Sequence, residues 1–284
     1  MKKLISVILF INIFFITSLL SSEIINPDIL KVALLPDENA ARIIKKHKKF
    51  KDYLENKLNK KIELIVTSDY SSMVEAIRFK RIHIGYFGPL SYTIAKSKTN
   101  ITPFAVREKN GKITYNSIII GNKESNILNL SDVKGKDFGF GDVASTSSHL
   151  IPKKMLIDSG LRENKDYKSI FLGAHDTIAI SVQNGNISAG GLSLPIYKLL
   201  LEKKIIDKDK INEIKISGNY PQYPWVFIDE LDSKLKTKII DAFIMLKNED
   251  ILAQMGGTAF RKARDQDYDI IRQLAKKLSI FNFQ

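Results

Sequence analysis

The sequence has 284 residues, of which 44% are hydrophobic and 26% charged, a balance that supports a large buried core and excludes a disordered or collagen-like chain. It contains no cysteine and 4 histidines, so we exclude disulfides and thiolate catalysis and expect no metal site and no cofactor. The formal net charge of +13 makes nucleic acid, a membrane surface and an anionic ligand the partner classes to consider.

The first 22 residues read as a targeting segment. Two basic residues, Lys2 and Lys3, precede an apolar run from residue 4 to 20, and two serines follow. This layout is typical of a secretory signal peptide, and its apolar core is short for a membrane span; an uncleaved anchor is the alternative. We expect an exported chain with a net charge of +11 after removal of the signal, which argues against nucleic acid as a partner.

Apolar runs and helical periodicities alternate along the remaining chain. Residues 30–35 (LKVALL) form an apolar run ended by Pro36, typical of a buried strand, and residues 38–58 place apolar side chains at helical spacing. Further predicted strands cover residues 62–66, 82–87, 117–121, 137–141 and 225–228, and further helices cover 71–79, 146–159, 177–185, 195–203, 232–246, 251–255 and 268–278. Such alternation favours βαβ units and parallel sheets. No flexible linker divides the sequence, so we expect two α/β lobes joined by ordinary strands, with a cleft between them.

The most informative stretch is 139–152 (GFGDVASTSSHLIP), where a strand and a turn lead into a helix that opens on Ser145, Thr146, Ser147 and Ser148. The first N–H groups of a helix have no intrahelical acceptor, and the positive end of the helix dipole lies beside them. With several hydroxyls added, this is a site for an oxyanion. An ordinary helix cap is the simpler interpretation, but four consecutive hydroxyl residues favour anion binding. No nucleotide-binding glycine motif occurs, so a nucleotide is not expected.

His175 is the second candidate for anion binding. It lies between the end of an apolar run and a helix that starts near Thr177, where its imidazole could donate to an anion and Asp176 could cap the helix. A structural loop histidine is the alternative. Ser145, His175 and Asp176 could suggest a hydrolase, but the sequence lacks a Gly-x-Ser-x-Gly elbow and an aspartate adjacent to a histidine usually points away from it.

Aromatic residues supply a third set of candidates. Tyr70 precedes a predicted helix, Tyr115 begins a strand, and Tyr86 and Phe87 end another strand before a Gly-Pro pair. Open α/β sheets bind their ligands at strand ends, so each residue could face a ligand. Any one of them could instead be a packing residue.

Several motifs occur in order along nearly the whole mature chain: 69–78 (DYSSMVEAIR), 84–91 (IGYFGPLS), 115–119 (YNSII), 141–152 (GDVASTSSHLIP), 173–176 (GAHD) and 255–261 (MGGTAFR). With these motifs the chain resembles the phosphate, phosphite and phosphonate solute-binding proteins of ABC importers. The resemblance implies a binding protein rather than an enzyme, located in the periplasm, that delivers a small phosphorus oxyanion to an inner-membrane permease. It implies that the anion is held by Ser145, Thr146, Ser147, His175, Tyr70 and Tyr115.

The resemblance also implies a two-lobed, type II-like periplasmic binding protein fold with the ligand in the interlobe cleft. After the export signal at 1–22, we expect one lobe to be formed by residues 23–113 and 217–284 and the other by residues 114–216. Most of the excess lysine is expected on helix faces rather than in the cleft.

Members that bind aminoalkyl phosphonates carry acidic residues in the later part of the cleft. The corresponding stretches here, 190–197 and 217–225, contain no Asp or Glu, and Pro195 and Tyr223 stand where the acids would fall. A buried ammonium group without a partner is costly, so we expect phosphite, methylphosphonate or phosphate rather than an amine-bearing ligand. An apolar wall against a methyl or P–H group could come from Tyr86, Phe87 or Tyr223.

Three alternatives remain open from the sequence. The same fold could present its closed form to a membrane sensor instead of a permease. A hydrolase that uses Ser145 is a second alternative, and a binding protein for a cofactor precursor is a third.

Overall fold

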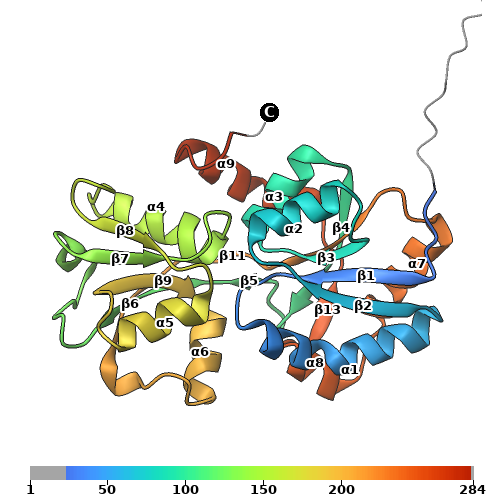
Figure 1. Ribbon diagram of the computed structural model, residues 1–284, viewed down its shortest axis with the longest axis horizontal. Coiled ribbons are helices and arrows are strands. Elements are labelled where there is room, and N and C mark those ends of the chain that lie inside the picture. Colours follow the sequence, from blue (N-terminus) through green and yellow to red (C-terminus); the bar gives the residue numbers. More distant parts are fainter. Residues whose placement is uncertain (1–23, 283–284) are drawn as a thin grey trace, which may run out of the picture.

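The computed structural model describes residues 24–282, so the predicted export signal lies outside the described residues. Figure 1 shows two α/β lobes side by side. Between them lie the short strands β5 (Thr114–Tyr115) and β11 (Tyr220–Pro221), which pair with each other antiparallel. Over the described range, no helix has the length and apolar character needed to cross a membrane.

The first lobe is built on a six-stranded sheet with the order β13-β4-β12-β3-β1-β2. Its strands are β1 (Ile29–Leu34), β2 (Lys61–Val66), β3 (Ile84–Tyr86), β4 (Ile101–Glu108), β12 (Pro224–Ile228) and β13 (Ala259–Arg261). Its helices are α1 (Ala40–Leu58), α2 (Tyr70–Arg78), α3 (Pro89–Lys98), α7 (Ser233–Ile244), α8 (Glu249–Gln254) and α9 (Asp269–Lys277), the last preceded by a 3₁₀ turn at Asp265–Tyr268.

The second lobe is built on a five-stranded sheet with the order β10-β6-β9-β7-β8. Its strands are β6 (Ser117–Asn122), β7 (Asp137–Phe140), β8 (Lys168–Phe171), β9 (Ala189–Ser193) and β10 (Ile211–Ile216). Its helices are α4 (Ile151–Asp158), α5 (His175–Gln183) and α6 (Leu194–Glu202), with a π-helical turn at Thr146–Leu150 and 3₁₀ turns at Leu130–Val133 and Lys208–Lys210.

The expectation of parallel sheets is correct only in part. The neighbours β2, β1 and β3 run parallel, as do β8, β7 and β9. However, β12 runs antiparallel to both β3 and β4, and β6 runs antiparallel to β9 and β10. Side-chain periodicity identifies a strand but carries no information on its direction, and β12 enters the first sheet only after the chain has returned from the second lobe.

Helix α1 illustrates how the sequence determines these elements. The Asn39 side chain accepts a hydrogen bond from the Arg42 N–H and so caps the first turn. The apolar face, with Phe50 and Leu54, is buried against the first sheet. The helix ends at Asn59, whose φ of 51° is left-handed, a conformation that asparagine tolerates well.

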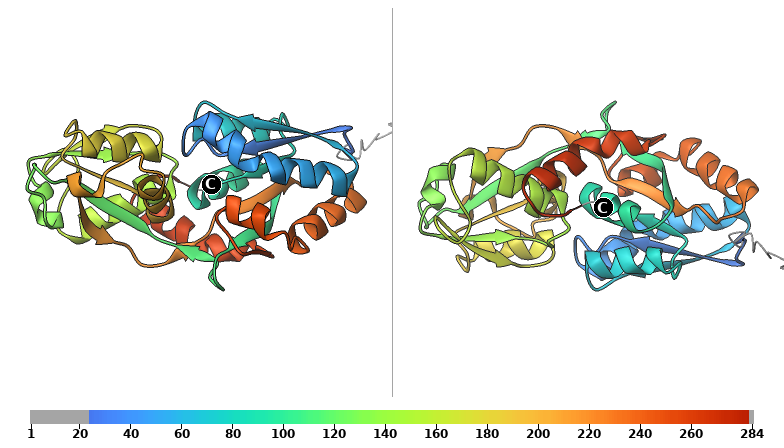
Figure 2. Two further views of the ribbon diagram at one scale, coloured as in Figure 1. Left: turned by 90° about the horizontal axis from the view of Figure 1, so that it is seen from below. Right: turned by 90° about the horizontal axis from the view of Figure 1, so that it is seen from above.

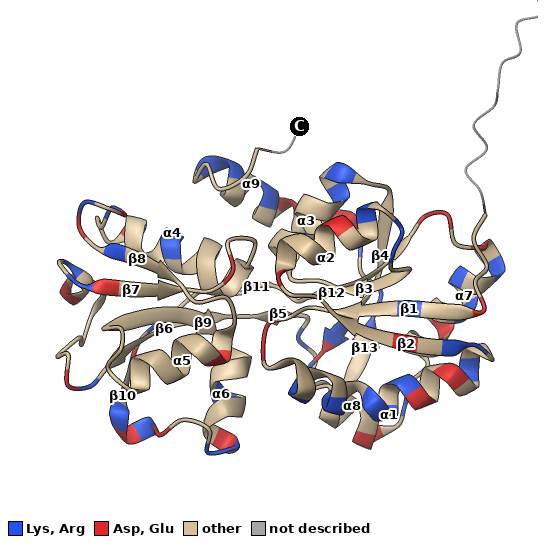
Figure 3. Cartoon of the chain, viewed as in Figure 1, with Lys and Arg blue, Asp and Glu red and all other residues tan. Residues whose placement is uncertain are grey.

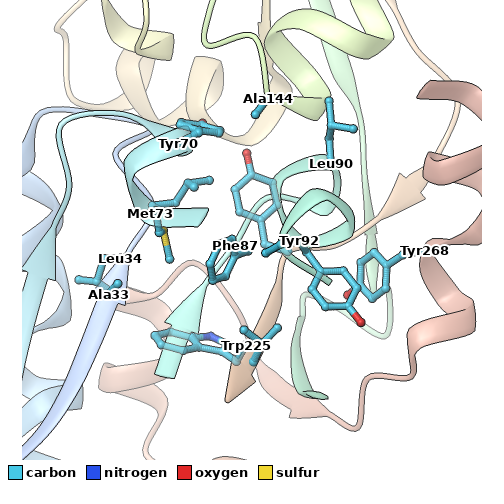
Figure 4. Packing of buried hydrophobic residues seen from close by; sticks show 14 of the residues in the cluster. Ala33, Leu34, Tyr70, Met73, Phe87, Leu90, Tyr92, Ala144, Trp225 and Tyr268 are labelled. Atoms are coloured by element: carbon cyan, nitrogen blue, oxygen red, sulfur yellow. The ribbon is translucent and has the colours of Figure 1, made fainter. Parts of the chain in front are cut away.

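The main hydrophobic core continues from the first lobe into the second. Figure 4 shows Ala144 of the second lobe beside Tyr70 and Leu90 of the first, and all three residues belong to one buried cluster. At the other end of this cluster, Trp225 packs against Phe243 with ring centroids 5.1 Å apart. Figure 2 shows the C-terminal helix α9 reaching towards the second lobe, where it contacts the π-helical turn. The lobes are therefore in direct contact beside the connecting strands β5 and β11, an arrangement that we call closed.

Candidate binding site

The hydroxyl-rich turn at Thr146–Leu150 opens α4 with an unusually wide first turn. The Leu150 N–H binds the Ser145 carbonyl five residues back, at 3.1 Å, which defines a π-helical rather than an α-helical turn. The Ser145 Oγ accepts hydrogen bonds from the backbone N–H and the side-chain hydroxyl of Ser148, at 3.2 and 2.7 Å. Gly141 allows this packing, because a Cβ at that position would lie 2.1 Å from the Ser148 Oγ. The turn therefore places two well-fixed hydroxyl residues, Thr146 and Ser147, at the helix start.

Four predicted side chains end in buried polar atoms that have no hydrogen-bond partner within residues 24–282. These atoms, which we call the cradle donors, are Tyr70 Oη, Tyr115 Oη, Ser147 Oγ and His175 Nε2. The four residues are at most 4% exposed. Leaving a buried polar group unpaired costs about 1–3 kcal/mol, so four such groups from separate segments call for a ligand that satisfies them.

A short chain of hydrogen bonds holds two of the cradle donors in place. Ser117 on β6 and Ser193 on β9 are direct cross-strand neighbours. The Ser117 hydroxyl donates to the Ser147 carbonyl at 2.6 Å, and the Ser193 N–H donates to Nδ1 of His175 at 3.1 Å. The paired strands therefore hold Ser147 and His175 near each other, where β6 begins and β9 ends.

The protonation state of His175 follows from the same contact. Burial lowers the pKa of His175 to about 3, so the ring is neutral at physiological pH. Because Nδ1 accepts the Ser193 N–H, the single ring proton resides on Nε2. The residue therefore presents an N–H donor rather than a charge.

The two tyrosines of the set are donors as well. Burial raises the pKa of Tyr70 and of Tyr115 well above the usual range, so both phenols keep their protons. The hydroxyl of Ser147 offsets part of the rise in the pKa of Tyr115, which places these two side chains within interaction range. Tyr70 comes from the first lobe, Ser147 from the second and Tyr115 from the connecting strand β5, so the donors come together only when the lobes are in contact.

The Thr146 side chain makes a hydrogen bond between the lobes. Its Oγ1 accepts a hydrogen bond from the Leu90 N–H, at 2.8 Å, at the start of α3. A hydroxyl that accepts one hydrogen bond can still donate another, so this contact does not prevent Thr146 from meeting a ligand.

Two more interlobe contacts involve first-lobe helix starts. The Tyr70 N–H at the start of α2 donates to Asp142 Oδ2 at 3.1 Å. Asp176 accepts from the Asn39 N–H at 3.1 Å and pairs with Arg42 at 3.3 Å, both near the start of α1. The expectation that Asp176 caps its own helix is therefore incorrect: Ala174 is the cap residue of α5, and the Asp176 carboxylate reaches across to the other lobe.

The aromatic candidates Tyr86, Phe87 and Tyr223 separate into two environments. Tyr86 stacks on Trp225 with centroids 4.8 Å apart and lies 5.5 Å from Tyr223, whose ring meets that of Tyr115 at 5.2 Å. Phe87 is fully buried, and a Cβ on the neighbouring Gly85 would lie 2.3 Å from its ring. Tyr86 and Tyr223 therefore lie near the cradle donors, and Phe87 belongs to the main hydrophobic core.

A cavity of about 790 Å³ between the lobes, which we call the vestibule, opens beside this site. Tyr223 and Ser193 line it, and these residues contact Tyr115 and His175. Its cationic lining residues are Arg42, Lys45, Lys46, Arg107, Lys109, Lys198 and Lys203. Figure 3 shows the positions of Lys and Arg spread over both lobes, and five lysines are among the residues that line the vestibule.

The vestibule also holds acids that the sequence reasoning missed. Asp37 and Glu38 lie three and four residues after the end of β1, beyond the carboxyl end of a parallel strand, where open α/β sheets bind their ligands. Burial, and then the neighbouring Glu38, raise the pKa of Asp37 to about 7. Burial, and then Arg107, lower the pKa of Lys46. No group of three or more acidic or histidine side chains suited to a metal ion occurs among the described residues.

Comparison with known proteins identifies relatives over most of the chain. Residues 32–268 match the family described as ABC transporter, phosphonate, periplasmic substrate-binding protein. A probable ABC transporter phosphite-binding protein of Prochlorococcus marinus is 27% identical over 271 residues, which cover 89% of this chain and 91% of that one. The phosphonates-binding periplasmic protein of Escherichia coli is 28% identical over 287 residues, which cover 96% and 84% of the two chains.

A solved structure shows the same architecture. The structure of PhnD1 from Prochlorococcus marinus in complex with methylphosphonate superposes with a TM-score of 0.84 at 25% sequence identity, covering 90% of this chain and 100% of that one. The two-lobed periplasmic binding protein fold expected from the sequence is thereby confirmed.

Proposed function

Because the chain belongs to the family of periplasmic substrate-binding proteins of phosphonate ABC transporters, we propose that it captures a small phosphorus oxyanion on the cradle donors and delivers it to a permease. The family consists of binding components of importers, not of enzymes. The observation that carries the ligand assignment is the set of four buried donors described above. Phosphite, methylphosphonate and phosphate each offer at least three oxygens to such donors.

The chemistry of the donors suits an oxyanion held without a neutralising charge. Two phenols, a hydroxyl and a neutral imidazole N–H all donate and carry no charge of their own. The N-terminal amides of the turn at Thr146–Leu150 add further donors at the positive end of a helix. Hydrogen bonds to a charged acceptor are worth about 1.5–3 kcal/mol each, roughly twice a neutral bond.

The acids of the vestibule do not favour an amine-bearing ligand. Glu38 lies 3.6 Å from the Arg42 guanidinium and 3.9 Å from the Lys46 ammonium. Asp37 is near Lys46 and Arg107, and its raised pKa leaves it partly protonated at neutral pH. Three cations thus surround two acids, so an added ammonium group would meet net positive charge. We therefore propose a ligand without an amine.

Closure about β5 and β11 provides the mechanism of capture. We propose that these strands are the hinge between a lobe of residues 23–113 and 217–284 and a lobe of residues 114–216. The ligand favours the closed form because donors from both lobes meet only there. We further propose that residues 1–22 direct the chain to the periplasm and are removed, and that the closed form docks on an inner-membrane permease.

A binding panel on the mature chain tests this function. Phosphite, methylphosphonate, phosphate, 2-aminoethylphosphonate and sulfate are compared by thermal unfolding and calorimetry. A bound ligand at 100 times its Kd should stabilise the protein by about 2.7 kcal/mol. If none of the phosphorus oxyanions raises the unfolding midpoint, the proposed function is wrong. Tighter binding of 2-aminoethylphosphonate than of phosphite would overturn the exclusion of amines.

A pair of matched variants tests the site itself. Tyr115→Phe removes a cradle donor and should weaken binding by about tenfold to a hundredfold. Tyr167→Phe is the control: its hydroxyl is also buried with no partner in residues 24–282, but it packs against Phe138 in the second lobe, outside the cradle. Equal losses for both variants would show that the effect is not specific to the proposed site.

A further inference from the structure

The vestibule is much larger than a phosphite or methylphosphonate ion requires. Its volume of about 790 Å³ falls within the range of about 300–1,000 Å³ that is usual for sites of much larger ligands. It adjoins the cradle donors through Tyr223, which packs on Tyr115, and through Ser193, which binds the His175 ring. A substituent on the phosphorus atom would therefore extend into the vestibule.

The charged side chains that line the vestibule are mostly cationic. Seven cationic side chains line it, against the three acids Asp37, Glu38 and Glu202. They come from α1, from β4 and the turn after it, and from α6 in the other lobe, so the excess of positive charge surrounds the cavity.

Two of these cations, Lys46 and Arg107, are incompletely neutralised. Lys46 is about one-quarter exposed, and its ion pair with Glu38 is long, at 3.9 Å. The same Glu38 is shared with Arg42 at 3.6 Å. Arg107 donates through Nη1 to the Met255 carbonyl, while its buried Nε has no hydrogen-bond partner in the described part of the chain. A negatively charged group entering the vestibule would satisfy these donors.

Building on the proposed function, we propose that the vestibule binds a second anionic group, so that the protein accepts phosphonates whose substituent carries a carboxylate. The phosphonate group would occupy the cradle donors, and the carboxylate would lie near Lys46 and Arg107. Bidentate pairing suits a guanidinium and a carboxylate, and the partial burial of the pair strengthens it relative to a surface ion pair. Net positive surroundings disfavour the corresponding amine.

Calorimetry with four ligands separates this inference from the proposed function. Methylphosphonate reports on the cradle donors alone. Phosphonoacetate and 3-phosphonopropionate add a carboxylate at two different distances from the phosphorus atom, and 2-aminoethylphosphonate adds an amine. At least one phosphonocarboxylate should bind about tenfold or more tightly than 2-aminoethylphosphonate. If methylphosphonate binds and neither phosphonocarboxylate exceeds the amine, the inference is refuted while the proposed function stands. If no ligand binds, both are refuted.

Variants locate the second anionic group. Lys46→Met should weaken phosphonocarboxylate binding by about tenfold and leave methylphosphonate within twofold. Because Lys46 is partly buried and its loss could disturb folding, Lys198→Met on the exposed surface of α6 provides a second variant with the same expected selectivity and a smaller effect. Lys49→Met, on α1 but outside the vestibule and paired with Asp250, is the control and should change neither affinity. Equal weakening of both ligand classes by Lys46→Met and Lys198→Met would overturn the assignment.

Discussion

Replacing Ser147 by alanine removes one cradle donor and leaves the backbone of the π-helical turn intact. In the closed form without ligand the Ser147 Oγ is buried and has no partner among residues 24–282, and in the open form it contacts water, so its removal breaks no hydrogen bond within the protein. The Ser117 hydroxyl binds the Ser147 carbonyl, which alanine retains. The free energy of unfolding should therefore stay the same or rise by up to about 1 kcal/mol.

Ligand affinity, by contrast, should fall in Ser147→Ala. A hydrogen bond from the Ser147 hydroxyl to a charged oxygen is worth about 1.5–3 kcal/mol, which corresponds to a loss of roughly 10- to 150-fold in affinity. Calorimetry with methylphosphonate or phosphite measures the Kd, and thermal unfolding without ligand measures stability. The combination of unchanged stability and weakened binding distinguishes a ligand contact from a packing residue.

A matched serine serves as the control for this experiment. Ser169 in β8 also has a buried Oγ without a partner in residues 24–282, but it lies on the edge strand of the second sheet, away from the cradle donors. Ser169→Ala should leave affinity within twofold of the parent protein. Affinity within twofold for Ser147→Ala, or a clear loss of folding stability in that variant, would refute the reasoning.

Three further predictions follow from the contacts around the site. Asp176→Asn removes the ion pair with Arg42 that joins the lobes, so it should destabilise the closed form and lower ligand affinity by about three- to tenfold in calorimetry; an unchanged affinity would contradict the closure role. Asp37 has a folded pKa raised from 3.8 to about 7, so its ionisation favours unfolding as pH rises through this window; the gain in melting temperature from Asp37→Asn should therefore increase between pH 4 and pH 7, and a constant gain would be inconsistent with that shift. The cations of the vestibule should accelerate association of anionic ligands, so stopped-flow association rates should fall as salt rises, more steeply than in Lys46→Met; identical salt slopes would exclude steering by this residue.

Sequence reasoning worked best where one local segment determines the outcome. The hydroxyl run at residues 145–148 follows a strand, and the capping chemistry of Ser145 is visible in the sequence itself. The predicted helix over residues 146–159 is correct in place, but its first turn is π-helical and packs Ser148 closely against Gly141. That contact between neighbouring segments has no signature in hydrophobic periodicity.

Sequence-based predictions failed where several segments that are distant in the sequence together form one feature. The vestibule is assembled from the loop after β1, α1, β4 and α6, so its excess of cations could not be read from any one stretch. The sequence pattern also could not predict strand direction: β12 runs antiparallel to both β3 and β4.

The cradle donors have a consequence for the resting state of the protein. If each donor left without a partner on closing costs about 1 kcal/mol, four of them disfavour the empty closed form by about 4 kcal/mol, close to a thousandfold, before the interlobe hydrogen bonds offset part of this. In the open form, water satisfies the same groups. Unloaded molecules would then present the closed shape only rarely, and a transporter that responds to that shape would be protected from consuming ATP in idle cycles.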